Sequence, residues 1–306
     1  MAKLISARPI AEGVWQLTDP FENRAYVVAG RERALLVDAM AGFGDVVAQA
    51  SELAGGLPVT VALTHRHCDH VGGSFGAGEV LMSAADDVEA AWEESERGAR
   101  LFAEVARREG MVPDGEKCAV ERGGRPRVSH VGEGDALDLG GRTVDVVELA
   151  GHTVGSVGYL VRDAGLLLSG DAVTPVMCLC FAESLTLDAW RQTLAKMAGL
   201  DFTAFWTGHH DVPFGKDSLE GFAAAADFAE GDRGHEWHHS IMPGWEGTIH
   251  LVPNGVWSPD SPDFRAVITR GRIQRARAQQ IPLTNYGMTI ARAHNILPRA
   301  LAPLDA

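Results

Sequence analysis

The chain has 306 residues, 46% of them hydrophobic and 22% charged, which is typical of a globular protein with a sizeable core. Its formal net charge is -14 and no basic run stands out, so we expect no nucleic-acid partner, because such a partner requires an electropositive face. No uninterrupted apolar stretch approaches about 18 residues, so we also expect no membrane span.

The N-terminal segment and the cysteines predict a cytoplasmic protein. Lys3 and Arg8 lie near the start, but the long apolar region of a secretory signal does not follow. The cysteines form no paired Cys-x-x-Cys motifs, so free thiols in a reducing compartment are expected. The four cysteines are Cys68, Cys118, Cys178 and Cys180.

The first third of the chain predicts short strands followed by a long helix. Apolar or β-branched runs broken by turn signals are typical of strands. Helical spacing predicts a helix over Gly44–Ala54, which ends at a Gly-Gly pair, and a second helix over Ala84–Arg108. The predicted strands are Val14–Thr18, Arg24–Val28, Ala34–Asp38 and Val59–Leu63.

The middle of the chain repeats this alternation. Helices are predicted over Leu185–Met197, with Asp188 favourably placed in the first turn, and over Ser218–Glu230. Glycine turns separate the apolar runs between them. The predicted strands begin near Val128 and continue with Thr143–Leu149, Ser156–Arg162, Leu166–Ser169 and Ala204–Thr207.

A change of texture at Gly231 to Gly234 predicts a boundary between a domain over 1–230 and an extension over 231–306. The extension is richer in proline, with strands expected at Thr248–Val252 and Phe264–Thr269. Its tail, Ile281–Ala306, has weak periodicity, and we expect it to be ordered by packing on the body or on a second subunit. The extension therefore closes a pocket or builds a homodimer, and the sequence leaves both open.

The run His-Arg-His-Cys-Asp-His directly after the apolar strand Val59–Leu63 predicts a metal site. In an extended strand end, His65 and His67 point the same way, and a tight turn then brings Asp69 and His70 to a second position. Imidazoles and a carboxylate suit Zn²⁺ or Fe²⁺. One stretch of chain can therefore serve two metal ions.

Further motifs follow in a fixed order. Asp38 ends a strand, and Ala150–Ser156 reads Gly-His-Thr-x-Gly-Ser after an alanine. Leu168–Asp171 ends in Gly-Asp, and Thr207–His209 reads Thr-Gly-His. Together with the histidine run, these motifs resemble those of the metallo-β-lactamase fold superfamily, with Ala150 where proline is usual. The resemblance covers roughly residues 10–230.

The resemblance implies a fold of the α+β (α/β) class: a four-layer αββα sandwich of two mixed β-sheets flanked by helices, here with a C-terminal extension. It also implies a ligand set. His65, His67 and His152 would bind one metal ion, Asp69, His70 and His209 would bind the second, and Asp171 would bridge both. Asp38 would fix a ligand loop or an imidazole tautomer.

Two Zn²⁺ ions are the expected cofactors, with iron or manganese as alternatives. Two dications, two carboxylates and one bridging hydroxide leave a residual charge of about +1, which suits an anionic transition state. Each ion can lower the pKa of bound water to about 7, so a nucleophile is present at neutral pH. Asp69 and Asp171 are the predicted catalytic residues, and Asp69 could hold the hydroxide in orientation.

These features predict a dinuclear hydrolase acting on a small ester, thioester, lactone or related molecule. A β-lactam or phosphodiester hydrolase is one alternative. Another is an oxidoreductase of the persulfide-dioxygenase kind, a group that resembles glyoxalase II yet binds one iron through two histidines and an aspartate. His65, His152 and Asp171 would supply those ligands. No clear basic set for a glutathione carboxylate is present, so the sequence leaves the substrate open.

Several residues near the motifs keep two interpretations. His210 contacts substrate or faces solvent, and the side chain of Cys68 is expected to pack away from the metals. Trp92 and Phe102 pack in the helical core or face the substrate, and Cys178 and Cys180 line the pocket or the core. The cluster His235, His238 and His239 predicts a surface or interface segment, with a third metal site as the alternative. His130, His250 and His294 are interpreted as structural.

Overall fold

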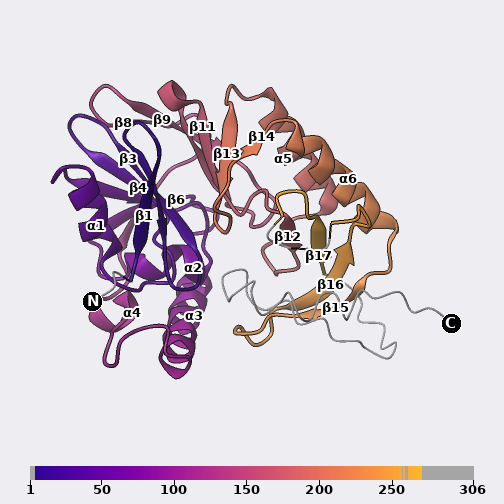
Figure 1. Cartoon of the computed structure of the whole chain (residues 1–306), viewed down its shortest axis with the longest axis horizontal. Helices are drawn as coiled ribbons and strands as arrows, with labels where there is room; N and C mark the ends of the chain where they lie inside the picture. The colour runs from indigo at the N-terminus through magenta and orange to yellow at the C-terminus, as the bar shows by residue number, and fades with distance from the viewer. Residues whose placement is uncertain (1–3, 257, 259–260, 271–306) are drawn as a thin grey trace.

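The computed structural model describes residues 4–256, 258 and 261–270 (Figure 1). The predicted tail over Ile281–Ala306, and His294 within it, lie outside the described residues. Within the described ranges, no helix is both long enough and apolar enough to cross a bilayer.

The first sheet has seven strands among the described residues, in the order β1-β2-β3-β4-β5-β6-β7. Its first four strands pair antiparallel, and from β4 onward the pairing is parallel. The sheet is therefore mixed, as expected. Its strands are β1 (Ser6–Ala11), β2 (Val14–Thr18), β3 (Arg24–Ala29), β4 (Ala34–Val37), β5 (Val59–Ala62), β6 (Glu79–Met82) and β7 (Arg127–His130).

The second sheet is also mixed and has six described strands, in the order β14-β13-β11-β10-β9-β8. Its one parallel pair joins β11 to β13, and the other neighbours run antiparallel. Its strands are β8 (Ala136–Asp138), β9 (Thr143–Glu148), β10 (Val157–Val161), β11 (Leu166–Gly170), β13 (Ala204–Thr207) and β14 (Phe214–Gly215).

Side-chain alternation along the strands creates the layers of the sandwich. In β4, Leu35 and Val37 point into a cluster between the two sheets, whereas Ala34 and Leu36 point to the outer face of the first sheet. In β11, Leu167 points to the outer face of the second sheet. Helices cover both outer faces (Figure 1), so the expected four-layer α/β architecture is confirmed.

The helices on the two outer faces belong to different parts of the chain. On the first sheet they come from the N-terminal half, and on the second they are α5 and α6, which pack on each other. Side chains of Asp45 and Thr186 cap the starts of α1 and α5. The α-helices are α1 (Val46–Leu53), α2 (Cys68–Val71), α3 (Glu89–Arg108), α4 (Ala119–Arg122), α5 (Leu187–Gly199) and α6 (Ser218–Gly231), with 3-10 helices at Gly72–Ser74 and Arg162–Ala164.

A third sheet, of four described strands in the order β12-β17-β16-β15, was not predicted. Its strand β12 (Val176–Leu179) pairs in parallel with β17 (Ala266–Thr269), so residues on both sides of the predicted boundary share one sheet. The strands β15 (His235–His238) and β16 (Glu246–Leu251) complete it. The division at 230/231 into two domains stays a prediction.

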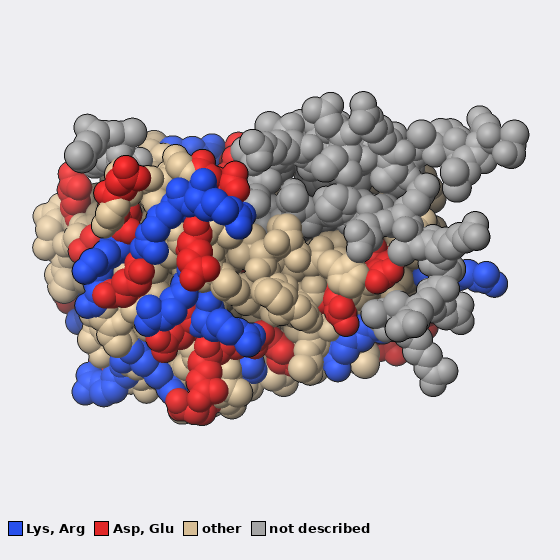
Figure 2. Space-filling view, turned by 90° about the horizontal axis from the view of Figure 1, so that it is seen from below, with Lys and Arg blue, Asp and Glu red and all other residues tan. Residues whose placement is uncertain are grey.

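Most predicted element boundaries shift by one or two residues in the structure, and the start of the first long helix shifts further. The first long helix begins at Glu89 and not at Ala84, and β16 ends at Leu251. The surface over α3 carries pairs such as Arg100 with Glu96 and Arg125 with Glu89. Figure 2 shows Lys and Arg side chains interleaved with Asp and Glu on this face, so it presents no extended basic area.

Candidate metal centre

The seven predicted ligands lie in segments that follow strands, and two of them, Asp69 and His70, belong to the short helix α2. His65 to His70 follow β5, and His152 follows β9. Asp171 follows β11, and His209 follows β13. Their donor atoms form three overlapping groups, and within each group all ligand atoms lie within 4.8 Å of one another. The groups are His65, His67 and His152; His65, His70 and Asp171; and Asp69, His70 and His209.

Three imidazole nitrogens converge in the first group. Nδ1 of His67 lies 3.1 Å from Nε2 of His65 and 2.9 Å from Nε2 of His152. Burial lowers the pKa of His65 well below its usual value, and burial together with His67 lowers the pKa of His152 to about 4. Both rings are therefore neutral near pH 7, which is the form that binds a metal ion.

Asp171 lies between the two ends of the cluster. Its Oδ2 is 3.0 Å from Nε2 of His209 and 3.8 Å from Nε2 of His152, and its Oδ1 is 3.5 Å from Nε2 of His70. Nε2 of His209 also lies 3.6 Å from Oδ2 of Asp69. Burial would raise the pKa of Asp171, but His209 and His70 outweigh it and hold that pKa well below its usual value.

The cluster fits divalent cations. Oδ1 of Asp69, Nε2 of His70 and Oδ1 of Asp171 are buried, and they have no hydrogen-bond partner among the described residues. Buried polar atoms in that state are costly, and a metal ion would satisfy all three. Asp171 and Asp38 outweigh burial and raise the pKa of His70 well above its usual value, so this acidic end of the cluster favours a positive charge. A bound metal ion would supply that charge in place of the His70 proton.

Three candidate ligand rings, those of His65, His70 and His152, also have a partner at the nitrogen that faces away from the cluster. Nδ1 of His65 lies 3.1 Å from Oγ1 of Thr64, and Nδ1 of His152 lies 2.8 Å from the carbonyl oxygen of Cys178. Nδ1 of His70 lies 2.8 Å from Oδ2 of Asp38. Such contacts fix ring orientation and tautomer.

Asp38 contacts both a loop and an imidazole, the two roles between which the sequence did not decide. Besides His70, its carboxylate accepts hydrogen bonds from the backbone nitrogen of Thr64 at 2.7 Å and from the Thr64 hydroxyl. Asp38 has a φ of 63°, a conformation that is uncommon for a residue with a side chain. Its backbone is therefore strained where its carboxylate supports the centre.

Three residues beside the centre lie outside the motifs, and two of them, Glu183 and Trp245, were missed by sequence reasoning. Oε1 of Glu183 lies 2.9 Å from Nε2 of His67. The rings of Phe181 and Trp245 contact the His67 ring, with centroids 4.6 Å and 5.1 Å away. Glu183 and Phe181 follow β12, and Trp245 precedes β16. Phe181 ends the apolar run Pro175–Phe181, for which pocket lining and core packing were the two interpretations. No motif spacing links Glu183 or Trp245 to the histidine run, so the sequence carries no signal for them.

Cys68 and His210 do not join the converging donor groups in the described part of the chain. Cys68 is buried against α3, where a Cβ on Gly98 would lie 2.5 Å from its sulfur, so it packs away from the ligands as expected. Nδ1 of His210 lies 3.3 Å from Oγ1 of Thr207, and its ring packs on Phe214. His210 is buried, so the solvent-facing interpretation is wrong.

The remaining candidates occupy structural positions. Trp92 and Phe102 are buried in the core beneath α3, and Cys180 is buried with the third sheet. All four cysteines are free, as predicted. The cluster His235, His238 and His239 lies on and after β15, outside the converging donor groups of the described residues. His130 is exposed and bonds to Asp87.

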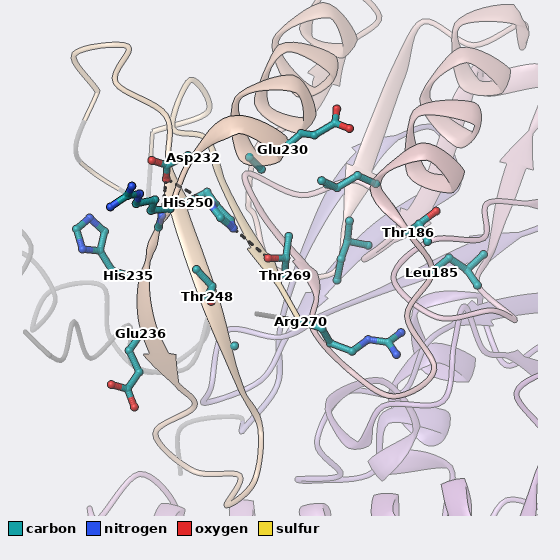
Figure 3. Close-up of a pocket in the computed structure, with 16 residues that line it drawn as sticks. Leu185, Thr186, Glu230, Asp232, His235, Glu236, Thr248, His250, Thr269 and Arg270 are labelled. Carbon is teal, nitrogen blue, oxygen red and sulfur yellow. Dashed lines mark hydrogen bonds and ion pairs between the residues drawn. The ribbon is translucent and has the colours of Figure 1, made fainter. Parts of the chain in front are cut away.

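A separate pocket of about 940 Å³ lies between the end of α6 and the third sheet (Figure 3). His250 lies in its wall and is held by Oδ2 of Asp232 at 3.2 Å and Oγ1 of Thr269 at 3.0 Å. Those bonds agree with the structural role predicted for His250. None of the seven candidate ligands lines this pocket, so it is distinct from the candidate centre.

Comparison with known proteins places these motifs in context. A family model described as the metallo-beta-lactamase superfamily matches residues 18–209. A second model, the hydrogen maturase F tetramerization domain, matches residues 265–303, most of which lie outside the described residues. The oligomeric state stays a prediction.

Curated relatives share part of their length with this chain. A hydroxyacylglutathione hydrolase of Roseobacter denitrificans is 27% identical over 49% of this chain and 47% of its own. An acyl-coenzyme A thioesterase, MBLAC2, of Gallus gallus is 30% identical over 54% of this chain and 65% of its own. The chain thus spans about half of the first relative and less than two thirds of the second.

Solved structures agree on the fold. A metallo-beta-lactamase from Pontibacter korlensis has a TM-score of 0.53 at 16% identity, covering 73% of this chain and 99% of that one. A metallo-beta-lactamase family protein from Thermus thermophilus has a TM-score of 0.51 at 22% identity, covering 71% and 80%.

Proposed function

Because the chain belongs to the metallo-beta-lactamase superfamily, we propose that its converging histidines and aspartates hold two divalent metal ions and that the protein hydrolyses a small ester, thioester or lactone. The observation that carries the proposal is the meeting of seven donor side chains, from four segments that each follow a strand, in three overlapping groups. The convergence of so many donors supports metal binding, because imidazole nitrogens and carboxylate oxygens are common metal ligands.

In this proposal His65, His67 and His152 hold one ion, and Asp69, His70 and His209 hold the other. The carboxylate of Asp171 reaches toward both, since its oxygens lie within 4 Å of histidines of each group. Five imidazoles and two carboxylates suit zinc, with iron or manganese as alternatives.

Two ions bound there would supply an activated water molecule as the nucleophile and polarise the substrate carbonyl. Oδ1 of Asp69, which is buried and has no hydrogen-bond partner among the described residues, would accept a hydrogen bond from that water and so orient it. The two carboxylates, Asp69 and Asp171, only partly offset the charge of two dications, and the net positive charge favours an anionic transition state. Imidazoles that ligate a metal ion are neutral, so they would add no charge.

A thioester is the substrate that we favour, for two reasons. The relatives named above are a hydroxyacylglutathione hydrolase and an acyl-coenzyme A thioesterase. In addition, Phe181 and Trp245 pack on each other at 4.6 Å and form an aromatic wall beside His67. We infer that this wall contacts an apolar acyl group of the substrate.

Trp245→Ala is expected to raise the KM for thioesters with a bulky apolar acyl group by about tenfold, with a smaller effect on kcat, because an aromatic contact is lost. Acetyl thioesters, which do not reach the wall, are expected to change little. Trp245→Phe is the control and should keep most of the affinity. Equal losses for short and bulky acyl groups would contradict an acyl-binding role.

Metal analysis tests the centre directly. Protein produced without added metal is expected to contain about two equivalents of zinc per chain. The purified protein is then assayed against thioesters, lactones, phosphodiesters and a chromogenic β-lactam, and thioester turnover is expected to be fastest. One iron per chain together with sulfide-dependent oxygen uptake would contradict the hydrolase and favour the persulfide-dioxygenase alternative.

A further inference from the structure

His67 has an acidic partner on the side away from the candidate centre. Its Nδ1 faces the nitrogens of His65 and His152, while its Nε2 lies 2.9 Å from Oε1 of Glu183. The side chain of Glu183 is only 10% exposed. When Nε2–H donates to this carboxylate, the lone pair of the ring must lie on Nδ1, the nitrogen that faces the other ligands.

We propose that Glu183 is a positioning residue, which fixes the tautomer and the orientation of His67 for metal binding. The inference rests on the proposed metal centre. Asp38 has the same relation to His70 at the other end of the cluster, since each carboxylate accepts from the outward nitrogen of one candidate ligand. A carboxylate in this position also makes the imidazole a stronger ligand.

The loop that carries Glu183 is tied to the loop that carries His152. The backbone nitrogen of Val154 donates to the carbonyl oxygen of Glu183 at 3.0 Å, and that of Leu185 donates to Gly151 at 2.8 Å. The hydroxyl of Ser184 donates to the carbonyl oxygen of His152 at 2.7 Å. The carboxylate is therefore held in register with a second candidate ligand, as precise positioning requires.

A connected set of polar and aromatic contacts surrounds His67 and includes Glu183. Nε of Arg66 lies 3.8 Å from Oε1 of Glu183, and another nitrogen of Arg66 lies 4.0 Å from Glu94 on α3. Nε1 of Trp245 donates to Glu94 at 3.0 Å, and the Trp245 ring packs on His67. These contacts link α3, the histidine run, the loop after β12 and the third sheet. The largely buried charge of Glu183 thus has both a cation and a donor nearby, which its burial requires.

The test measures zinc affinity by competition with a chromogenic chelator. Glu183→Ala is expected to weaken zinc binding about 10- to 100-fold, the range found when partners of metal-ligating histidines are removed. Glu183→Gln should lose less, because the amide oxygen still accepts from Nε2 but carries no charge. Glu236→Gln is the matched control. Its carboxylate accepts from Nε2 of His238 at 2.7 Å, but that histidine is not a candidate ligand, so zinc affinity should not change.

The melting temperature of the metal-free variants separates positioning from folding. We expect Glu183→Gln to melt like the wild type without metal and to gain less stability when zinc is added. Should Glu183→Ala fail to fold, the glutamine variant decides. Wild-type zinc affinity in the Glu183 variants would overturn this inference alone. Failure of the wild type to bind any metal would overturn the proposed function as well.

Discussion

Replacing Asp171 with alanine is expected to abolish hydrolysis and to release metal in the same variant. The oxygens of Asp171 approach histidines of both proposed ligand sets, so its loss would leave the two proposed ions without a shared ligand. We expect kcat/KM to fall by at least about 100-fold, the lower bound for removing one preorganised electrostatic group. The measurement is kcat/KM together with metal content per chain after gel filtration.

The control for this variant is Asp201→Ala, because Asp201 is an exposed aspartate that belongs to none of the motifs. It should keep full activity and full metal content. Full activity in Asp171→Ala would rule out the ligand assignment. Lost activity with the complete metal content retained would leave Asp171 a catalytic role but not a bridging one.

Gly208→Ala is expected to lower activity about as much as Asp171→Ala does, but through packing alone. A Cβ at this position would lie 2.4 Å from Cε1 of His70 and 2.6 Å from Oδ1 of Asp171, closer than atoms pack. Two candidate ligands would have to move, so we expect activity to fall at least about 100-fold, as when one electrostatic group is lost. We also expect the unfolding free energy to fall by about 1–3 kcal/mol, the usual cost of overpacking.

The matched control is Gly199→Ala at the end of α5, where an added Cβ meets nothing within 4 Å. It should keep activity and metal content and should not lower the melting temperature. Activity assays, metal analysis and thermal unfolding of both variants check the prediction. An active Gly208→Ala protein with two metals would show that the loop yields without disturbing His70.

The elements predicted with the correct bounds are those whose burial is apparent from their own residues. β2 and β13 have the bounds expected from their apolar runs, because such strands are buried on both faces. The histidine run also needed only local information, since four donors lie within six residues. By contrast, β1 is largely exposed and contains Pro9, so its sequence lacks a strand pattern.

The late start of α3 has a tertiary cause. Asp86 is fully buried just before the helix, and its carboxylate accepts from the backbone nitrogens of Arg66 and Gly155 and from the hydroxyl of Thr153. These bonds hold the chain in a turn and tie it to both motif loops. Helical periodicity cannot reveal such partners, because they lie far away along the chain.

Glu183 and Trp245 were missed for the same reason. They reach His67 only because β12, followed by the Glu183 loop, joins a sheet with strands from the C-terminal part of the chain. Motif reasoning suggests seven candidate donors, whereas the side chains that contact and border them depend on strand pairing over long separations. A sequence indicates the candidate ligands of a metal centre more readily than the residues that contact and orient those ligands.

The parallel pairing of β12 with β17 also sets an order of events during protein synthesis. The segment with β12 leaves the ribosome long before residues 266–269 are synthesised. The edge of β12 that pairs with β17 therefore stays unpaired during that time. Unpaired strand edges invite association with other chains. We therefore expect a nascent chain that has just completed His209 to hold every donor residue, yet to depend on chaperones until β17 emerges and closes the sheet.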